Sequence, residues 1–317
     1  MLKFWMGRIA LAVLVMWLVS VLVFWGSQVL PGDVAQLALG QYATPQAVAT
    51  LREQMGLNQP APYRYLLWLI GMLHGDWGVS LVTGTPVAQM LSERAANTGL
   101  LAIVTVVIAV PLAIGLGMLM SLGRGRWADR LASVAVLSLA AAPEFLIATI
   151  AVLLLAVKLR WLPAISYLTP DSSLGHIARA LVLPVMTLVI IVSAQIARMT
   201  RAILGNLMSQ PFAEMAMLKG VARGAIVRKH ALIQAVGPIA NVVALNVAYM
   251  VSGVVVVETI FSYPGLARLM TDAVLSRDMP VIQACAMLFS AVYVILVLLA
   301  DALAKAFDVR GPGRRGA

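Results

Sequence analysis

The sequence predicts an all-α membrane protein with six transmembrane helices. Of its 317 residues 62% are hydrophobic and only 11% are charged, and the mean hydropathy is +0.94, far outside the range of soluble domains. Several runs are almost free of charge and long enough to cross roughly 30 Å of hydrocarbon. None of them alternates between polar and apolar residues, so we expect helices rather than a β-barrel.

Six runs qualify, and each can form one α-helix because a helix satisfies its own backbone groups in lipid. The first is too long for a signal peptide and lacks a small-residue cleavage site, so we expect a retained span. The fourth is the shortest and contains Pro184, yet it still reaches across the hydrocarbon at ~1.5 Å per residue. The bounding residues are Arg8 and Asp33, Arg94 and Arg124, Arg130 and Lys158, Arg179 and Arg198, His230 and Glu258, and Asp278 and Asp301.

Basic residues predict the orientation of these spans. With the N-terminus inside, most of the 23 lysines and arginines fall in cytoplasmic segments, and the first external segment is too long for its arginines to count. Both termini are therefore predicted to be cytoplasmic. An anionic inner leaflet then accounts for the net charge of +10 without a nucleic-acid partner. The single cysteine, Cys285, excludes an intrachain disulfide.

The segment after the first span contains two predicted helices. Thr44 and Pro45 can start a helix that Gly56 ends, over TPQAVATLREQMG. The next stretch, APYRYLLWLIGMLHGDWG, places Tyr and Trp around an apolar run too short to span, which predicts a helix lying along the membrane interface. This segment either packs on the outer rim of the bundle or contacts substrate directly.

No motif points to catalysis. The sequence has no G-x-x-x-x-G-K-[ST] phosphate loop, no G-x-S-x-G elbow and no metal-binding helix, and its three histidines are far apart. We therefore expect no catalytic, cofactor-binding or metal residues, no cofactor on this chain, and no enzymatic activity of its own.

Two polar features lie inside predicted spans. Glu144 follows Pro143 in AAAPEF, and it either lines a wet cavity or titrates during ion-coupled transport. In the fifth span Asn246, Tyr249 and Gly253 share a face at helical spacing. They either line a passage or bond to neighbouring helices. All four are candidate pathway-lining residues.

Charge gathers between the fourth and fifth spans, in FAEMAMLKGVARGAIVRKHALIQAVGP (residues 212–238). Pro211 can start a short helix, Glu214 suits its positive end, and Gly220 can end it. About thirty residues are more than a simple connection needs. A docking element is one interpretation, and a basic loop held to anionic headgroups is the other.

The run Glu214-Met215-Ala216-x-x-x-Gly220 resembles the EAA-x-x-x-G loop of ABC importer permeases, with Met215 in place of one alanine. Met217-Leu218 replaces the usual Arg-Ala before Lys219-Gly220. Further segments resemble the dipeptide, oligopeptide and nickel importer class in order: LPGD, TPQAVATLREQMGLNQP, HGDWGVSL with TGTPV, GRGRWADR, VVVETIFSYPGLARL, RDMPVIQ and FDVR.

The resemblance implies the type I importer permease fold in a multi-pass protein of the bacterial inner membrane. It implies residues 1–93 as the first span and a long periplasmic segment, 94–304 as a core of five helices with a cytoplasmic coupling loop at about 198–230, and 305–317 as a cytoplasmic tail. The implied partners are a second homologous permease, two ATP-binding cassette subunits, an external substrate-binding protein and membrane lipid. The residues that would couple the chain to an ATPase subunit are Glu214, Met215, Ala216, Lys219 and Gly220.

The implied function is to form half of a translocation pathway for peptides or a related small solute. An ion-coupled secondary carrier using Glu144 is the alternative, and a membrane scaffold is a third reading. The solute stays open among peptides, nickel chelates, glutathione and sugars.

Overall fold

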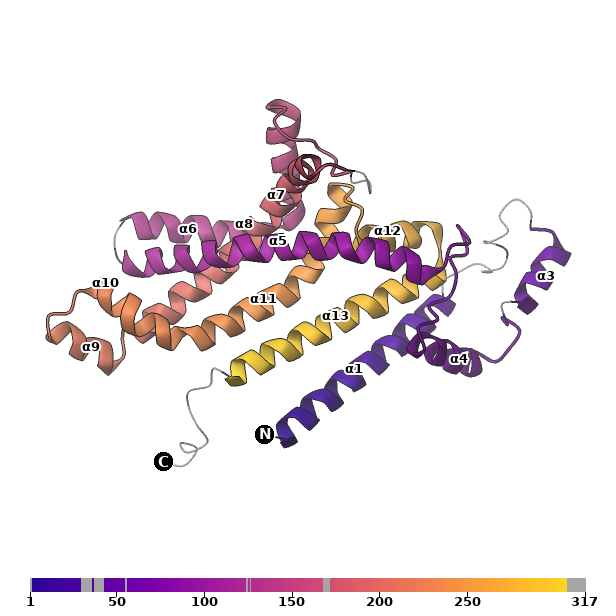
Figure 1. Cartoon of the computed structure of the whole chain (residues 1–317), viewed down its shortest axis with the longest axis horizontal. Helices are drawn as coiled ribbons and strands as arrows, with labels where there is room; N and C mark the ends of the chain where they lie inside the picture. The colour runs from indigo at the N-terminus through magenta and orange to yellow at the C-terminus, as the bar shows by residue number, and fades with distance from the viewer. Residues whose placement is uncertain are drawn as a thin grey trace. The chain divides into compact units, whose positions relative to one another are not determined.

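The computed structural model describes residues 2–29, 36, 43–54, 56–123, 125, 127–167 and 172–306. The regular structure of these residues is helical (Figure 1), apart from one isolated antiparallel bridge between Val79 and Pro86. The prediction of an all-α membrane protein is confirmed. The LPGD turn, part of the GRGRWADR loop and the tail from residue 307 lie outside the described residues.

Five helices of the described residues are long and apolar enough to cross a membrane, and one bent pair supplies a sixth crossing if it is a single span. Charged residues do not end these helices, so several extend beyond the charge-free runs. The five are α1 (Leu2–Val29), α5 (Val87–Leu122), α8 (Leu174–Leu207), α11 (Leu232–Ile260) and α13 (Met279–Ala306).

The third predicted span is not one helix. It consists of α6 (Trp127–Ala141) and α7 (Glu144–Ala151), which continues as the π-helix η2 (Val152–Lys158). The two arms are bent by 103°. Pro143 between them has extended geometry, with φ −60° and ψ 140°. Proline has no N–H to continue α6 and restrains the residue before it, so the chain turns there and restarts at Glu144.

The chain divides into two compact units. The first combines Met1–Thr98 with Pro264–Val292, and the second combines Gly99–Tyr263 with Tyr293–Ala317.

In the first unit, α3 (Pro45–Gln54) begins and ends where the sequence predicts. The Ala47 N–H donates to Thr44 Oγ1 at 3.2 Å, which caps the helix. Gly56 has φ +64°, and the Leu57 N–H donates to the Arg52 carbonyl at 2.9 Å. A left-handed glycine of this kind stops a helix without steric cost.

The next helix, α4 (Ala61–Leu73), has 13 residues and is therefore only about 20 Å long. It packs on the end of α1, where the Phe24 ring centroid lies 5.4 Å from that of Tyr65 and 5.7 Å from that of Trp68. The hydroxyls of Ser20 and Tyr65 are 2.8 Å apart. A helix too short to span is confirmed, while its position along the membrane interface stays a prediction.

A tight loop follows α4 and is fixed to the start of α13. Gly78 and Gly84 have φ of +78° and +70°, which lets the loop fold back on itself. Ser80 and Asp278 are both buried, and the Ser80 hydroxyl donates to the Asp278 carboxylate. The Leu81 N–H donates to the same carboxylate at 3.2 Å. The motifs HGDWGVSL and RDMPVIQ, distant in sequence, are thus joined through a buried carboxylate.

The segment before α13, between the fifth and sixth predicted spans, contains a helix that the charge-free runs did not predict. It is α12 (Leu266–Ser276), which starts after Gly265 and ends at the left-handed Arg277. Leu266, Leu269 and Ala273 recur at helical spacing and are buried in one apolar cluster with residues of α5 and α13. The helix is amphipathic and short, so a search for charge-free spans does not find it.

In the second unit the most buried element is α8, which arises from the shortest charge-free run. It has 34 residues, because Arg179, Arg198 and Arg201 lie inside it near its ends. It packs against α6, α7 and α11. The remaining elements of this unit are α9 (Pro211–Leu218), α10 (Arg223–Ile226) and the π-helix η3 (Val227–Ala231), which continues into α11.

Candidate functional site

The predicted docking element forms a short helix between the ends of α8 and α11 (Figure 1). Because α8 runs to Leu207 and α10 begins at Arg223, most of the stretch expected as a loop of about thirty residues is helical. Gln210 has extended geometry, with φ −87° and ψ 155°, and Pro211 occupies the first helical position. Glu214 lies in the first turn, where the helix dipole favours a negative charge.

The end of α9 is closed by its own backbone. Gly220 has φ +79°, and its N–H donates to the Met217 carbonyl at 2.9 Å. The Val221 N–H donates to the Ala216 carbonyl at 3.1 Å. This pair of bonds around a left-handed glycine is the Schellman motif. The prediction that Gly220 ends the helix is confirmed.

One face of α9 is held by the helices beside it. Ala213 is fully buried, and Phe212 and Ala216 pack against the same apolar cluster. That cluster also contains the end of α8 and the start of α11, with the residues Leu204, Met208, Ile226, Val227, Ala231, Ala235 and Ile239. A displacement of α9 therefore acts on the ends of two long helices through direct packing.

The other face of α9 is exposed. Glu214 and Lys219 lie on it, together with Met215 at 55%, Met217 at 44% and Leu218 at 78% exposure. The basic segment that follows, residues 228–230, is also exposed. A rigid helix with an exposed apolar surface beside charges is suited to a protein partner.

Of the candidate pathway residues, Glu144 and Gly253 lie against each other. Glu144 is the first residue of α7 and is partly buried, while Gly253 is buried in α11. A Cβ at Gly253 would lie 2.8 Å from Oε1 and 3.0 Å from Oε2 of Glu144. A side chain at position 253 would therefore require the Glu144 carboxylate to move.

The other two candidates differ in exposure. Asn246 is partly buried, and its Nδ2 donates to the Val242 carbonyl one turn earlier at 2.8 Å. Tyr249 is 63% exposed. The continuous helix α11 keeps both residues on the face that leads to Gly253. Their role in a pathway stays a prediction.

An ion pair that the sequence interpretation did not identify joins α6 to α8. Arg201 Nε and Nη2 donate to the two carboxylate oxygens of Asp129 at 2.9 and 2.8 Å. Asp129 is buried, and Ser133 Oγ and the Gly125 N–H also donate to its carboxylate. Nothing in the sequence predicted this pair, because no local pattern links residues so far apart.

A second buried charge lies at the end of α11. Glu258 and Tyr263 are both fully buried, and the Tyr263 N–H donates to the Glu258 carbonyl at 2.9 Å. Burial and the charge of Glu258 raise the pKa of Tyr263. The Ser166 N–H donates to the Phe261 carbonyl at 2.8 Å, which ties the segment after η2 to this turn. Residues 258–263 thus form a packed turn.

Nothing in the described residues resembles a metal centre, since they contain no group of three or more His, Cys, Asp or Glu side chains that could hold an ion. What they present is an exposed helical face on α9, between the end of α8 and the start of α11, and polar side chains along one face of α11.

Comparison with known proteins gives two family matches. The family described as binding-protein-dependent transport system inner membrane component matches residues 113–310, and its N-terminal counterpart matches residues 1–102. A probable peptide ABC transporter permease protein of Sinorhizobium fredii is 36% identical over 304 residues, which cover 96% of this chain and 97% of that protein. Glutathione transport system permease proteins of Escherichia coli K12 and Shigella dysenteriae are 34% identical over 308 residues, covering 97% of this chain and 98% of each relative.

Proposed function

The chain belongs to the binding-protein-dependent transport system inner membrane component family, and on that premise we propose that it forms half of the translocation pathway of an ATP-driven importer for peptides or a related small solute. It is a multi-pass inner-membrane protein and a transporter subunit, not itself an enzyme. Relatives named as peptide and glutathione permeases support this choice of solutes.

The observation that carries the proposal is the geometry of α9. Its inner face packs on the ends of α8 and α11, and its outer face is exposed. An ATP-binding cassette subunit seats on the outer face, around Glu214, Met215 and Lys219, while Ala216 lies on the packed side and Gly220 closes the helix. ATP is hydrolysed on that subunit, and α9 passes the resulting movement to the spans by rigid packing.

The complete importer contains a second homologous permease, two ATP-binding cassette subunits and an external substrate-binding protein, and this chain needs no cofactor. The absence of a phosphate loop in the sequence supports the separation of ATP hydrolysis from this subunit. Asn246, Tyr249 and the Glu144–Gly253 contact lie along the pathway. Exposure of Tyr249 in this single chain is consistent with a surface completed by the second permease.

The test perturbs only the backbone at the end of α9. A Cβ at Gly220 meets nothing within 4 Å, so a side chain there creates no clash. The positive φ alone makes Gly220→Val unfavourable by roughly 1 to 3 kcal/mol, which we expect to displace the docking face. Glu214→Lys is a second variant, because it reverses a charge at a positive helix end where the favourable interaction is ~0.3 to 1 kcal/mol.

Two matched controls separate this effect from a general loss of stability. Gly220→Asn keeps a residue that tolerates the left-handed region. Gly224→Ala places a Cβ in ordinary contact, 3.9 Å from Leu122 Cδ2. Both controls should behave as wild type.

The measurements are ATPase stimulation by substrate-loaded binding protein in the purified complex, and solute uptake in proteoliposomes. We expect Gly220→Val and Glu214→Lys to assemble normally and to lose most of both activities. Wild-type stimulation and uptake in both variants would mean that α9 is only a connector, and the proposal would fail.

A further inference from the structure

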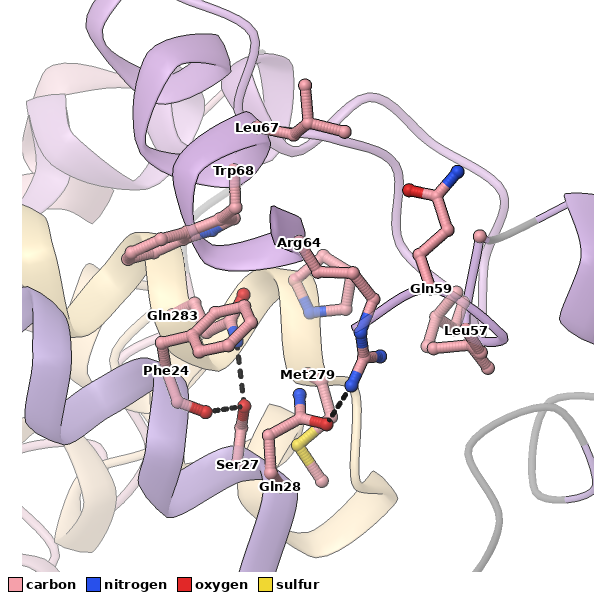
Figure 2. A pocket seen from close by; sticks show the side chains of 13 residues that line it. Phe24, Ser27, Gln28, Leu57, Gln59, Arg64, Leu67, Trp68, Met279 and Gln283 are labelled. Carbon is pink, nitrogen blue, oxygen red and sulfur yellow. Dashed lines mark hydrogen bonds between the residues drawn. The ribbon is translucent and has the colours of Figure 1, made fainter. Parts of the chain in front are cut away.

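A pocket of about 270 Å³ lies within the first unit, lined by the end of α1, residues 56–59, α4 and the start of α13 (Figure 2). Pockets that take drug-sized molecules measure roughly 300 to 1,000 Å³. This pocket therefore suits a single small group, such as one end of a larger molecule. Its lining includes no residue of the docking helix and none of the candidate pathway residues, and the proposed function does not use it.

The pocket contains a cation whose hydrogen-bonding capacity is only partly used. Arg64 Nη2 donates to Gln28 Oε1 at 2.6 Å. Arg64 Nε is buried without an acceptor, although a guanidinium carries five N–H donors. None of the described residues that line the pocket is acidic. Because a partly desolvated cation is stabilised by a nearby anion, the pocket is electrostatically suited to an anionic group.

The side chain beside Arg64 can provide a further donor. Gln28 accepts the arginine bond through its carbonyl oxygen, so its Nε2 remains free to donate. Deeper in the pocket, Gln283 Nε2 donates to Ser27 Oγ at 2.8 Å, and Ser27 Oγ donates to the Phe24 carbonyl at 2.6 Å. Those groups satisfy each other. Figure 2 shows the Arg64 guanidinium turned toward Gln28, with the Phe24 and Trp68 rings to one side of them.

The flank of the pocket is apolar and faces outward. No residue of α4 is buried in this chain. Several large side chains of this short helix are at least half exposed, namely Tyr63, Leu66, Leu67, Ile70 and Leu73. Tyrosine and tryptophan beside aliphatic side chains are typical of the membrane interface, where headgroups meet acyl chains. A molecule with an anionic group and an apolar chain matches both parts of this surface.

We propose that this pocket binds a phosphate group, held by Arg64 and Gln28, and that an anionic phospholipid supplies it. The arginine fork suits phosphate oxygens, the pocket has room for a headgroup, and the exposed apolar side chains of α4 are suited to contact acyl chains. A bound lipid would fix α4 against the ends of α1 and α13. Free phosphate has the same chemistry and is the other source to be distinguished.

The experiment uses the full chain, purified in detergent with the subunits that accompany it and exchanged into mixtures of phosphatidylglycerol and phosphatidylcholine. Native mass spectrometry then counts the retained lipids. We expect about fivefold preferential retention of phosphatidylglycerol in the wild type, as one arginine near an anionic headgroup provides. Arg64→Gln should abolish the preference. Arg52→Gln should keep it, because Arg52 lies exposed on α3 and does not line the pocket.

A second variant tests the proposal if Arg64→Gln destabilises the fold. If Arg64→Gln lowers the thermal-unfolding midpoint, Gln28→Ala removes the companion donor at an exposed position, and it should reduce the preference about twofold. Equal retention in the wild type and Arg64→Gln would overturn the proposal, as would equal losses in Arg64→Gln and Arg52→Gln.

Two further outcomes concern the source of the anion. Complete displacement of the lipid preference by millimolar inorganic phosphate would show that the pocket takes free phosphate, and the assignment to lipid would be wrong. Unchanged lipid retention in Arg64→Gln together with weaker association of the substrate-binding protein would show that Arg64 contacts a protein. That result would also overturn the proposal, while leaving the proposed transport function standing.

Discussion

Substitutions at two glycines of α5 can test how closely this helix approaches α8. A Cβ at Gly117 would lie 2.6 Å from Thr200 Cβ and 2.8 Å from the Ala197 carbonyl oxygen. A Cβ at Gly115, half a turn away, would meet nothing within 4 Å. The same substitution on the same helix therefore probes the interface at one position and open space at the other.

The expected effects have opposite signs. Alanine in place of a helical glycine stabilises a helix by roughly 0.5 to 1 kcal/mol, so Gly115→Ala should be neutral or stabilising. Gly117→Ala gains the same amount but forces the two helices apart by about 1 Å to reach ordinary carbon–carbon contact near 3.5 Å. Overpacking of this kind costs about 1 to 3 kcal/mol, which leaves a net loss of roughly 1 kcal/mol at the middle of both ranges and about 2.5 kcal/mol at most.

The assay is thermal unfolding of the purified full chain in detergent, followed by tryptophan fluorescence. Because unfolding of such proteins is often irreversible, the ranking at a fixed scan rate is the result that matters. Gly117→Ala should unfold a few degrees below the wild type, and Gly115→Ala at or above it. If both variants unfold at the same temperature, α5 and α8 do not pack as closely as the structure has them.

Further predictions concern charge. Asp129→Asn weakens the pair between buried Asp129 and partly exposed Arg201 and should lower the free energy of unfolding by roughly 1 to 2 kcal/mol, whereas Asp272→Asn, in an exposed pair, should change it by less than ~0.5 kcal/mol. Denaturant titration of both variants compares them. Glu144→Gln should leave uptake largely intact, because ATP supplies the energy; loss of uptake with normal assembly and ATPase activity would favour the ion-coupled carrier. A reporter behind residue 310 should be active in the cytoplasm, and one inserted near Gln59 only outside; the reverse pattern would refute the predicted orientation.

Local signals predicted several helix ends correctly, because the responsible interactions lie within one turn. Thr44 caps α3 through a bond three residues ahead, and Gly56 and Gly220 end helices through their own φ. None of these depends on distant parts of the chain. Composition likewise identified the spans, since lipid demands apolar surface whatever the tertiary structure.

The prolines show where prediction of helix ends from the local sequence fails. Pro111, Pro184 and Pro238 all lie inside continuous helices, while Pro143 separates two helices at 103°. The residue type is the same, so the difference comes from the surroundings. Neighbouring helices can satisfy the backbone groups that a proline leaves free, and a sequence does not state which prolines have such neighbours.

The amphipathic helix α12 and the pairings of distant residues were missed for related reasons. A search for charge-free runs detects helices that are apolar on all sides. Only one face of α12 is apolar and buried, and its exposed side carries Arg268 and Asp272, so the search does not detect it. Glu144 and Gly253 were both singled out, yet their contact follows from the packing of α7 on α11. The spacing of residues along one helix does not predict which residues of a second helix they contact.

The two faces of α9 explain why an unusual sequence is compatible with the proposed docking role. Where related loops have Arg-Ala, this chain has Met217 and Leu218, and both side chains are exposed. The residues that fix the helix are instead Ala213 and Ala216 on its packed face and Gly220 at its end. The replacement therefore leaves the packing and the closing bonds of α9 unchanged and alters only the surface that a partner meets. An apolar pair at that surface gains from burial when a partner covers it, so the departure from the family pattern changes the chemistry of docking and not the element that docks.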